Sequence, residues 1–238
     1  MAANKRAEAI VSAVVGRGAP RAANESDAEP TARSSSRRFI AVAGNIGVGK
    51  TTMVEYLCHR YGFRPFVEPN LQNPYLDDFY ADMKQWAFHS QISFLTHKFR
   101  IHNELMAEPS TVVQDRTIYE DAEIFARYLH ASGCMSDRDW KTYCDLYSVM
   151  RRVLEPPDLL IVLRCSVRAI RRRVRQRGRA NEQSIPAKYL RKLNELYEDW
   201  FARYDLSPVL EIDTENLDYV SDCVHRLEFQ RAVEPFLR

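Results

Sequence analysis

The chain has 238 residues, of which 45% are hydrophobic, and it carries a formal net charge of +2. This length and apolar content suffice for one globular domain with a sizeable core, and the near-neutral charge argues against a general nucleic-acid or membrane-surface binder. No apolar run approaches the length of about 18 residues that a membrane span requires, so we expect no membrane partner.

Residues 1–37 differ in composition from the rest of the chain. They are rich in Ala, Arg, Ser and Glu, contain two prolines and have no aromatic residue. Such a segment has little apolar surface to bury, which is typical of a disordered tail. Its arginines are also found in organelle transit peptides, but its four acidic residues argue against that alternative. We therefore expect a tail over 1–37 and one domain over 38–238.

Five cysteines occur along the chain without C-x-x-C spacing. They are Cys58, Cys134, Cys144, Cys165 and Cys223. Their odd number and scattered positions favour reduced thiols in a cytoplasmic protein over a disulfide framework, and they do not fit a metal cluster.

The predicted domain begins with a buried strand over 39–43, which runs directly into a glycine-rich segment. Residues 44–52 fit G-x-x-x-x-G-K-[ST] at every fixed position, and a helix is predicted over 53–60. Such a loop directs successive backbone N–H groups at phosphate oxygens. Lys50 is predicted to reach the terminal phosphates, and Thr51 to ligate Mg²⁺. The predicted ATP-binding residues of this loop are Gly44, Asn45, Ile46, Gly47, Val48, Gly49, Lys50, Thr51 and Thr52.

Beyond this loop, short apolar runs alternate with long helical segments. The runs cover residues 65–67, 111–114, 159–163 and 209–212. This alternation is typical of parallel strands joined by crossover helices. We expect an α/β fold with a five-stranded parallel sheet covered by helices on both faces, and ligands beyond the carboxyl ends of the strands.

Polar residues follow the second and third predicted strands, at the edge where ligands are expected. Glu68 follows the second strand, and Asp115 and Arg116 follow the third. A carboxylate at Glu68 is suited to accept the proton of a hydroxyl that attacks the γ-phosphate of ATP. The alternative is a solvated acid in a loop.

The fourth predicted strand leads into a segment rich in arginine. Eight arginines occur over 164–179, with no acidic residue and no aromatic residue among them. The missing aromatic residues argue against a single-strand nucleic-acid binder, which stacks bases on such side chains. We predict a lid over ATP, in which Arg173, Arg177 and Arg179 stabilise the charge of the transition state and exclude water.

Five motifs occur in a fixed order along the chain. They are GNIGVGKTT from Gly44, Glu68-Pro69, Tyr80 with Gln91 eleven residues later, DRTIYED from Asp115, and RGRANEQSIP from Arg177. A chain with these motifs resembles the deoxynucleoside kinases, most closely the bacterial deoxyadenosine/deoxyguanosine kinases. The resemblance covers about residues 38–230. It implies the P-loop kinase fold and ATP-dependent, Mg²⁺-assisted phosphorylation of the 5′-hydroxyl of a deoxynucleoside in nucleotide salvage.

The resemblance also implies roles for the matched residues. Glu68 would be the base that accepts the 5′-hydroxyl proton, and Arg116 a cation beside that hydroxyl and the transferred phosphate. Asp115 would be a metal ligand or the proton acceptor, and this alternative stays open. Tyr80 and Glu182 would hold the 3′-hydroxyl.

The same resemblance assigns residues to the two bases. Gln91 would pair with the nucleobase of the substrate, since its amide offers both donors and an acceptor. Lys98 and Asp121 fall where family members that accept purines and cytosine place an arginine and an aspartate. We expect them to bind the base and thymidine to be the poorest substrate; an ion pair that only braces two helices is the alternative. The turn that would lie beside the adenine of ATP comprises Glu215, Asn216 and Leu217.

The resemblance implies that the chain is a deoxynucleoside kinase, and we expect a homodimer. The resemblance implies the dimer, and the helices predicted over 84–107 and 136–154 carry more apolar residues than one sheet face covers. A nucleotide kinase of the thymidylate kinase type is the enzymatic alternative, although Glu68 would repel a monophosphate acceptor. A P-loop nucleic-acid-binding switch is the alternative from another class, and the near-neutral charge argues against it.

Overall fold

The structure is a computed structural model that describes residues 37–67, 73–179, 185–216 and 223–237. The predicted disordered tail lies outside the described residues, except for Arg37.

The described residues form one sheet of five parallel strands in the order β2-β3-β1-β4-β5. The strands are β1 (Phe39–Ala43), β2 (Arg64–Phe66), β3 (Val112–Asp115), β4 (Leu159–Arg164) and β5 (Val209–Asp213). The predicted five-stranded parallel sheet is therefore confirmed, and each strand end lies within one residue of its predicted place. Because all strands run the same way, their carboxyl ends share one edge, where ligands of such sheets bind.

Helices connect the strands and cover the sheet. They are α2 (Lys50–Tyr61), α3 (Leu76–Ala81), α4 (Met83–Ala107), α5 (Ile118–Glu120), the π-helix η2 (Asp121–Ala126), α6 (Arg127–Ala131), α7 (Asp137–Arg151), α8 (Val167–Arg177), α10 (Ala187–Arg203) and α11 (Cys223–Leu237). In the described part of the chain, no helix has both the length and the apolar character needed to cross a membrane.

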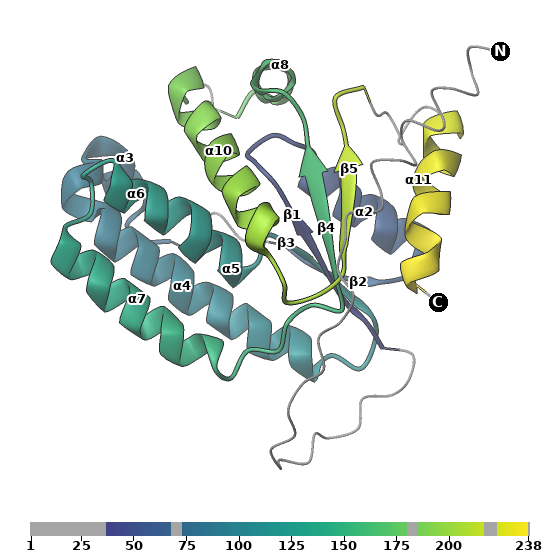
Figure 1. The fold of residues 1–238 in the computed structure, drawn as a ribbon, viewed down its shortest axis with the longest axis horizontal. Helices are drawn as coiled ribbons and strands as arrows, with labels where there is room; N and C mark the ends of the chain where they lie inside the picture. The colour runs from purple at the N-terminus through teal and green to yellow at the C-terminus, as the bar shows by residue number, and fades with distance from the viewer. Residues whose placement is uncertain (1–36, 68–72, 180–184, 217–222, 238) are drawn as a thin grey trace.

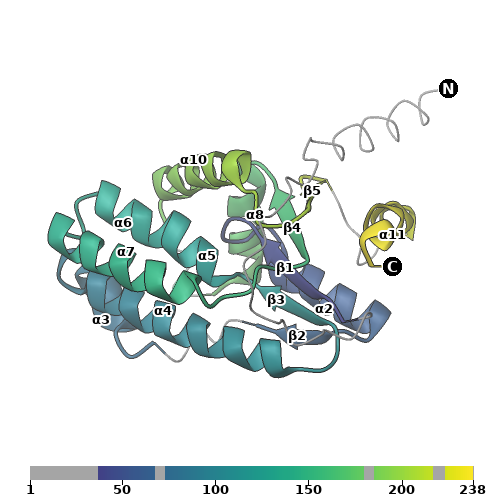
Figure 2. The same cartoon turned by 60° about the horizontal axis from the view of Figure 1, so that its bottom comes forward.

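β1 is buried along its whole length, and its side chains alternate between two hydrophobic cores. Phe39, Ala41 and Ala43 pack in a core with residues of α4, α7 and α10, whereas Ile40 and Val42 pack in a core with residues of α2 and α11. Figure 1 shows these two helical layers on opposite sides of the sheet, and Figure 2 shows them after rotation. The period of two along a strand explains how one short segment fills both cores.

Polar side chains define where three of the helices begin. The carboxylate of Asp82 accepts hydrogen bonds from the backbone N–H groups of Lys84 and Gln85 at the start of α4. The hydroxyls of Ser136 and Ser166 accept from the third residue of α7 and α8 in the same way. These caps satisfy N–H groups that have no partner inside the helix. α8 then ends at Gly178, whose φ of 72° suits a glycine.

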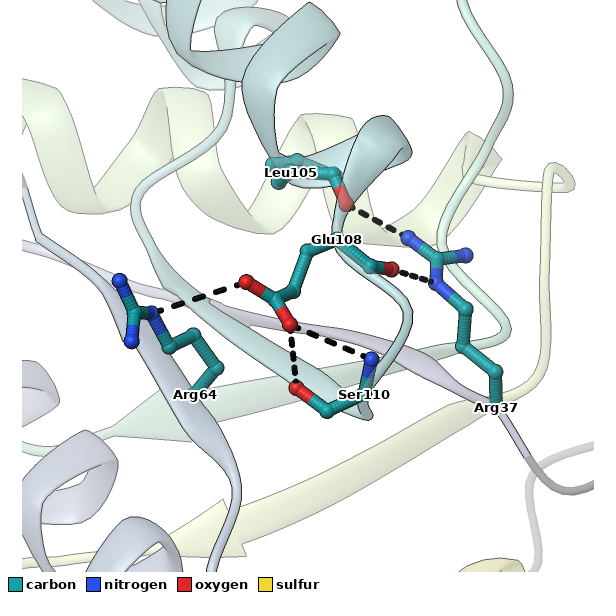
Figure 3. A network of polar contacts seen from close by, with 5 residues as sticks. All are labelled: Arg37, Arg64, Leu105, Glu108 and Ser110. Atoms are coloured by element: carbon teal, nitrogen blue, oxygen red, sulfur yellow. Dashed lines mark hydrogen bonds and ion pairs between the residues drawn. The ribbon is translucent and has the colours of Figure 1, made fainter.

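A polar network holds the C-terminal end of α4 against the starts of β1 and β2 (Figure 3). The Arg37 guanidinium donates to the carbonyl oxygens of Leu105 and Glu108, both at 2.6 Å. The Glu108 carboxylate accepts from the Ser110 hydroxyl at 2.8 Å and faces Arg64 at 3.8 Å. These contacts lower the pKa of Glu108, and the Ser110 hydroxyl is the largest cause. Arg37, the last residue of the predicted tail, thus contacts the folded domain.

Candidate active site

The carboxyl edge of the sheet opens into a cavity of about 760 Å³. Residues 46–52 of the P-loop form part of its wall, and Asp115 and Arg116 at the end of β3 form another part. Helices α3, α4 and η2 contribute Phe79, Gln91 and Asp121, respectively. Groups from the predicted phosphate site and from the predicted nucleoside site therefore line the same cavity.

Three glycines of the P-loop, Gly44, Gly47 and Gly49, have a positive φ, and at the first two an added side chain would also clash with neighbouring atoms. Gly44 has a φ of 143°, and a Cβ atom added there would lie 2.6 Å from the carbonyl oxygen of Leu163 in β4. Gly47 has a φ of 75°, and a Cβ atom there would lie 2.8 Å from a methyl group of Val174 in α8. The loop can thus lie close to β4 and to α8 only because side chains are absent at Gly44 and Gly47.

Lys50 is the first residue of α2, and its side chain folds back along the loop. Its Nζ donates to the carbonyl oxygens of Gly44 at 2.8 Å and Asn45 at 3.1 Å, and the residue is buried. Asn45 in turn donates to the carbonyl oxygen of Leu190 in α10 at 3.0 Å and to the side chain of Asn194. Two carbonyl oxygens of the P-loop therefore determine where the Lys50 ammonium group lies.

Thr51 and Asp115 meet where β1 and β3 end side by side. Val42 pairs with Asp115 in the sheet, and the loop that follows β1 brings Thr51 over the same point. The Thr51 hydroxyl donates to Oδ2 of Asp115 at 2.7 Å. Hydroxyl and carboxylate oxygens are ligands that Mg²⁺ prefers, and one carboxylate together with substrate phosphates is a usual way of holding this ion. The donor set fits Mg²⁺.

Arg116 has an unusual backbone conformation, with a φ of 60°. Its N–H donates to the Val42 carbonyl oxygen at 3.1 Å, and its own carbonyl oxygen accepts from Lys98 Nζ at 2.7 Å. Its guanidinium lies 4.5 Å from the centre of the Phe125 ring. A non-glycine residue in this region is under backbone strain, which is common at functional sites. Hydrogen bonds thus hold both the backbone N–H and the backbone carbonyl of Arg116, and the residue lines the cavity.

The helices supply a second group of polar side chains to the cavity. Gln91 on α4 is buried, and its Oε1 has no hydrogen-bond partner among the described residues. Asp121 on η2 is also buried and lines the cavity, as does the more exposed Tyr80 on α3. Lys98 is buried but is not among the described residues that line the cavity, since its side chain extends to the Arg116 carbonyl.

The arginines of the predicted lid have two different environments. Arg177 and Arg179 are exposed at the end of α8 and line the cavity. Arg173 lines the cavity too, but it is partly buried, and its Nη1 donates to the Val48 carbonyl oxygen at 3.0 Å and to the Thr214 hydroxyl at 3.1 Å. Arg173 therefore joins the P-loop to the residue that follows β5.

The predicted adenine turn is only partly described. The Glu215 carboxylate accepts from the backbone N–H and the hydroxyl of Ser166, at 2.7 and 2.9 Å, and so caps α8. These hydrogen bonds lower the pKa of Glu215. Asn216 follows it and is exposed. The other predicted site residues that lie outside the described residues are Glu68, Glu182 and Leu217.

Two interior residues of the site were not predicted from the sequence. Glu120 on α5 accepts hydrogen bonds from the P-loop and from Tyr197 on α10, and both residues are buried. Thr214 anchors Arg173. The motif DRTIYED contains Glu120, but the sequence pattern gives no sign that its side chain faces the P-loop.

Comparison with known proteins agrees with this geometry. The sequence model described as deoxynucleoside kinase matches residues 40–238. The deoxyadenosine/deoxycytidine kinase of Bacillus subtilis is 39% identical over 188 residues, which cover 77% of this chain and 86% of that protein. The deoxyadenosine kinase of Dictyostelium discoideum is 36% identical over 184 residues, which cover 76% of this chain and 74% of that protein.

Solved structures show the same similarity. A structure of deoxyadenosine kinase from M. mycoides with the products dCMP and a flexible dCDP bound has a TM-score of 0.72 and 29% identity. The match covers 83% of this chain and 97% of that one. A structure of the M. mycoides enzyme with bound dATP has a TM-score of 0.71 and 28% identity, over 84% of this chain and 100% of that one.

Proposed function

The chain belongs to the deoxynucleoside kinase family, and we propose that its cavity holds ATP with Mg²⁺ beside the 5′-hydroxyl of a deoxynucleoside. The protein is an ATP-dependent kinase that phosphorylates deoxynucleosides, as expected from its motifs. The observation that carries the arrangement is that one cavity is lined both by the P-loop and by Gln91, whose buried Oε1 has no hydrogen-bond partner among the described residues. Because the chain belongs to the deoxynucleoside kinase family, we reject the alternative of a nucleotide kinase of the thymidylate kinase type.

At the phosphate site, the residues of the P-loop provide the charge and the hydrogen bonds. Backbone N–H groups of the loop bind phosphate oxygens. When ATP binds, the Lys50 ammonium group leaves the Gly44 carbonyl oxygen and donates to the terminal phosphate instead. Thr51 and Asp115 hold Mg²⁺, which when bound neutralises negative charge on the phosphates. Together these groups orient the γ-phosphate for transfer.

At the 5′-hydroxyl, a carboxylate removes the proton as the oxygen attacks the γ-phosphate. We assign this role to Glu68, with Asp115 as the alternative base. Arg116 supplies positive charge to the transferred phosphate, supported by its fixed peptide and by its stacking on Phe125. Tyr80, which lines the cavity, and Glu182 bind the 3′-hydroxyl.

At the nucleobase, Gln91 and Asp121 bind the polar edge of the ring. Both are buried in the cavity wall, and Oε1 of Gln91 has no hydrogen-bond partner among the described residues, so a base that donates to this oxygen is favoured. Lys98 belongs to this substrate site through the carbonyl of Arg116. We propose a preference for deoxyadenosine, deoxyguanosine or deoxycytidine over thymidine, which agrees with the names of the relatives.

At the ATP side, the arginines of α8 bind phosphate rather than nucleic acid. Arg177 and Arg179 line the same cavity as the P-loop, which supports a lid over the triphosphate, with Arg173 fixed at its base. The turn of Glu215, Asn216 and Leu217 lies beside the adenine in this proposal. Failure to retain the protein on immobilised DNA or RNA at low salt would support this assignment.

We further propose a homodimer formed through α4 and α7. These helices pack against each other (Figure 1), yet Val149 in the last turn of α7 and Val153 in the turn that follows remain 62% and 68% exposed. Leu146 and Met150 of α7 are partly buried and pack against the hydrophobic core. A second copy of the chain is the proposed occupant, because the sequence resembles a dimeric family.

A cytoplasmic location is the remaining part of the proposal. Cys58, Cys134, Cys144 and Cys165 are free thiols. Free thiols are usual in the reducing cytosol.

The direct test measures phosphorylation of each of the four deoxynucleosides by the purified protein with ATP and Mg²⁺, and of the corresponding monophosphates. We expect turnover of deoxyadenosine, deoxyguanosine or deoxycytidine, the slowest turnover with thymidine, and none with monophosphates. Turnover of monophosphates but of no nucleoside would contradict the proposed function.

A further inference from the structure

A fully buried carboxylate that no catalytic step uses lies beneath the P-loop. Glu120 has no exposed surface, and its two oxygens accept three hydrogen bonds. Oε1 accepts from the Gly44 N–H at 3.2 Å and from the Tyr197 hydroxyl at 2.9 Å, and Oε2 accepts from the Thr117 N–H at 2.9 Å.

The three donors belong to three separate parts of the active site. Gly44 begins the P-loop, and its carbonyl oxygen accepts from Lys50. Thr117 directly follows Arg116, whose φ of 60° redirects the chain at the end of β3. Tyr197 lies on α10, the helix whose Leu190 carbonyl receives the P-loop asparagine. One side chain thus connects the phosphate loop, the Arg116 turn and the helix beyond the lid.

The charge of this carboxylate also matches its surroundings. Burial raises the pKa of Glu120, because the charged form loses its hydration, while Arg116 and Lys50 oppose that shift. A buried acid is costly unless hydrogen bonds and opposite charges compensate it. Here the compensating cations are the two residues assigned above to the transferred phosphate.

We propose that Glu120 is a positioning residue for phosphoryl transfer, which holds the first residue of the P-loop and the Arg116 turn in register. This inference rests on the proposed function, because it takes Lys50 and Arg116 as the groups that act on the phosphate. Glu120 itself touches no substrate. It acts by fixing the backbone at Gly44 and at Thr117, so that Lys50 and Arg116 are both directed at the transferred phosphate.

Glu120→Gln tests the inference with little change in side-chain volume. An amide has one acceptor oxygen and one NH₂ group, so one of the two backbone N–H groups now faces a donor instead of an acceptor. We expect kcat to fall by about 10²-fold, the loss that a misplacement of about 1 Å can cause. The loss should be equal for every nucleoside, with little change in the KM for nucleoside, and the Gly44 and Thr117 amides should exchange hydrogen faster.

Two further variants make the test specific. Tyr197→Phe removes one donor and leaves both backbone contacts, so kcat should fall less than in Glu120→Gln but again equally for all nucleosides. Glu123→Gln is the matched control: Glu123 lies three residues further along and forms an exposed ion pair with Arg203 at 2.6 Å. Its kcat should equal that of the unchanged enzyme.

The inference is overturned if a folded Glu120→Gln enzyme keeps the kcat of the control. If that variant does not fold, an unchanged kcat in Tyr197→Phe, or rapid hydrogen exchange at Gly44 and Thr117 in the unchanged enzyme, overturns it instead. Lys50→Ala and Arg116→Ala, measured in the same assay, separate this failure from a failure of the proposed function. Full turnover in both of them would remove the site assignment, whereas a loss there beside full turnover in Glu120→Gln would remove only the role of Glu120.

Discussion

The Thr51 hydroxyl donates a 2.7 Å hydrogen bond to the Asp115 carboxylate, which joins the first turn of α2 to the carboxyl end of β3. Neither residue is near the other in the sequence. The pairing of β1 with β3 brings them together, because Val42 and Asp115 are partners in the sheet. Two hard oxygen donors thereby face the cavity at the place where the P-loop binds phosphate.

The first prediction concerns this pair as the Mg²⁺ site. Asp115→Asn replaces a charged oxygen ligand with a neutral amide, so the Mg²⁺ concentration that gives half-maximal rate should rise, on the order of tenfold for a loss of about 1.4 kcal/mol. A titration of turnover with Mg²⁺ at saturating ATP measures this change.

Glu68→Gln is the comparison that separates the metal ligand from the base. Loss of a general base lowers kcat by about 10² to 10⁴-fold, and the Mg²⁺ requirement should stay the same. If Asp115→Asn has a normal Mg²⁺ requirement and a much lower kcat than Glu68→Gln, Asp115 is the base.

The second prediction concerns Lys50, whose Nζ lies 2.8 Å from the Gly44 carbonyl oxygen. Lys50→Ala should abolish turnover of every nucleoside alike, because all of them share the phosphate donor. The fold should persist, but ATP should no longer raise the melting temperature, since a ligand stabilises a protein only in proportion to its binding. Lys192→Ala, which removes an exposed pair with Glu195, is the control and should behave as the unchanged enzyme. Normal turnover in Lys50→Ala would contradict the P-loop assignment.

The sheet and the phosphate loop could be predicted from sequence because local patterns determine them. The run 39–43 is buried on both faces, and the glycines at 44 and 47 stand where a side chain would meet β4 or α8. Apolar runs and fixed glycines are read directly from the order of residues.

Long-range polar contacts could not be predicted in the same way. Arg173 lines the cavity as expected of a lid residue, but the sequence did not indicate that its Nη1 also donates to Val48 and Thr214, residues far from it in the chain. The sequence likewise did not indicate the hydrogen bond from Lys98 Nζ to the Arg116 carbonyl oxygen. A long, flexible arginine or lysine side chain has several partners within reach. The packing of several helices and strands decides which partner it contacts, and the sequence motif alone does not.

The third prediction concerns the dimer surface on α7. Val149→Asp together with Val153→Asp places two charges on the proposed interface, where their burial would be costly. We expect light scattering to give a dimer mass for the unchanged protein and a monomer mass for this double variant at micromolar concentration. Val224→Asp, at an exposed valine of α11, is the control and should remain a dimer. A monomer mass for the unchanged protein would contradict the proposed assembly.

The last prediction concerns base preference, and it compares Asp121 with Lys98. Asp121 lines the cavity, whereas Lys98 is not among the described residues that line it and donates to the Arg116 carbonyl oxygen. Asp121→Ala should lower kcat/KM for the preferred nucleosides by a factor that corresponds to about 1 to 3 kcal/mol, the cost of losing a buried polar contact. The ratio of their kcat/KM to that of thymidine should therefore become smaller. Lys98→Met should lower kcat for all four nucleosides by a similar factor, because it weakens the support of Arg116 and leaves the base edge unchanged. Measured kcat/KM values for the four deoxynucleosides with each variant distinguish the two effects. An unchanged preference in Asp121→Ala would show that this carboxylate does not bind the base, and a changed preference in Lys98→Met would show that the lysine reaches the base directly.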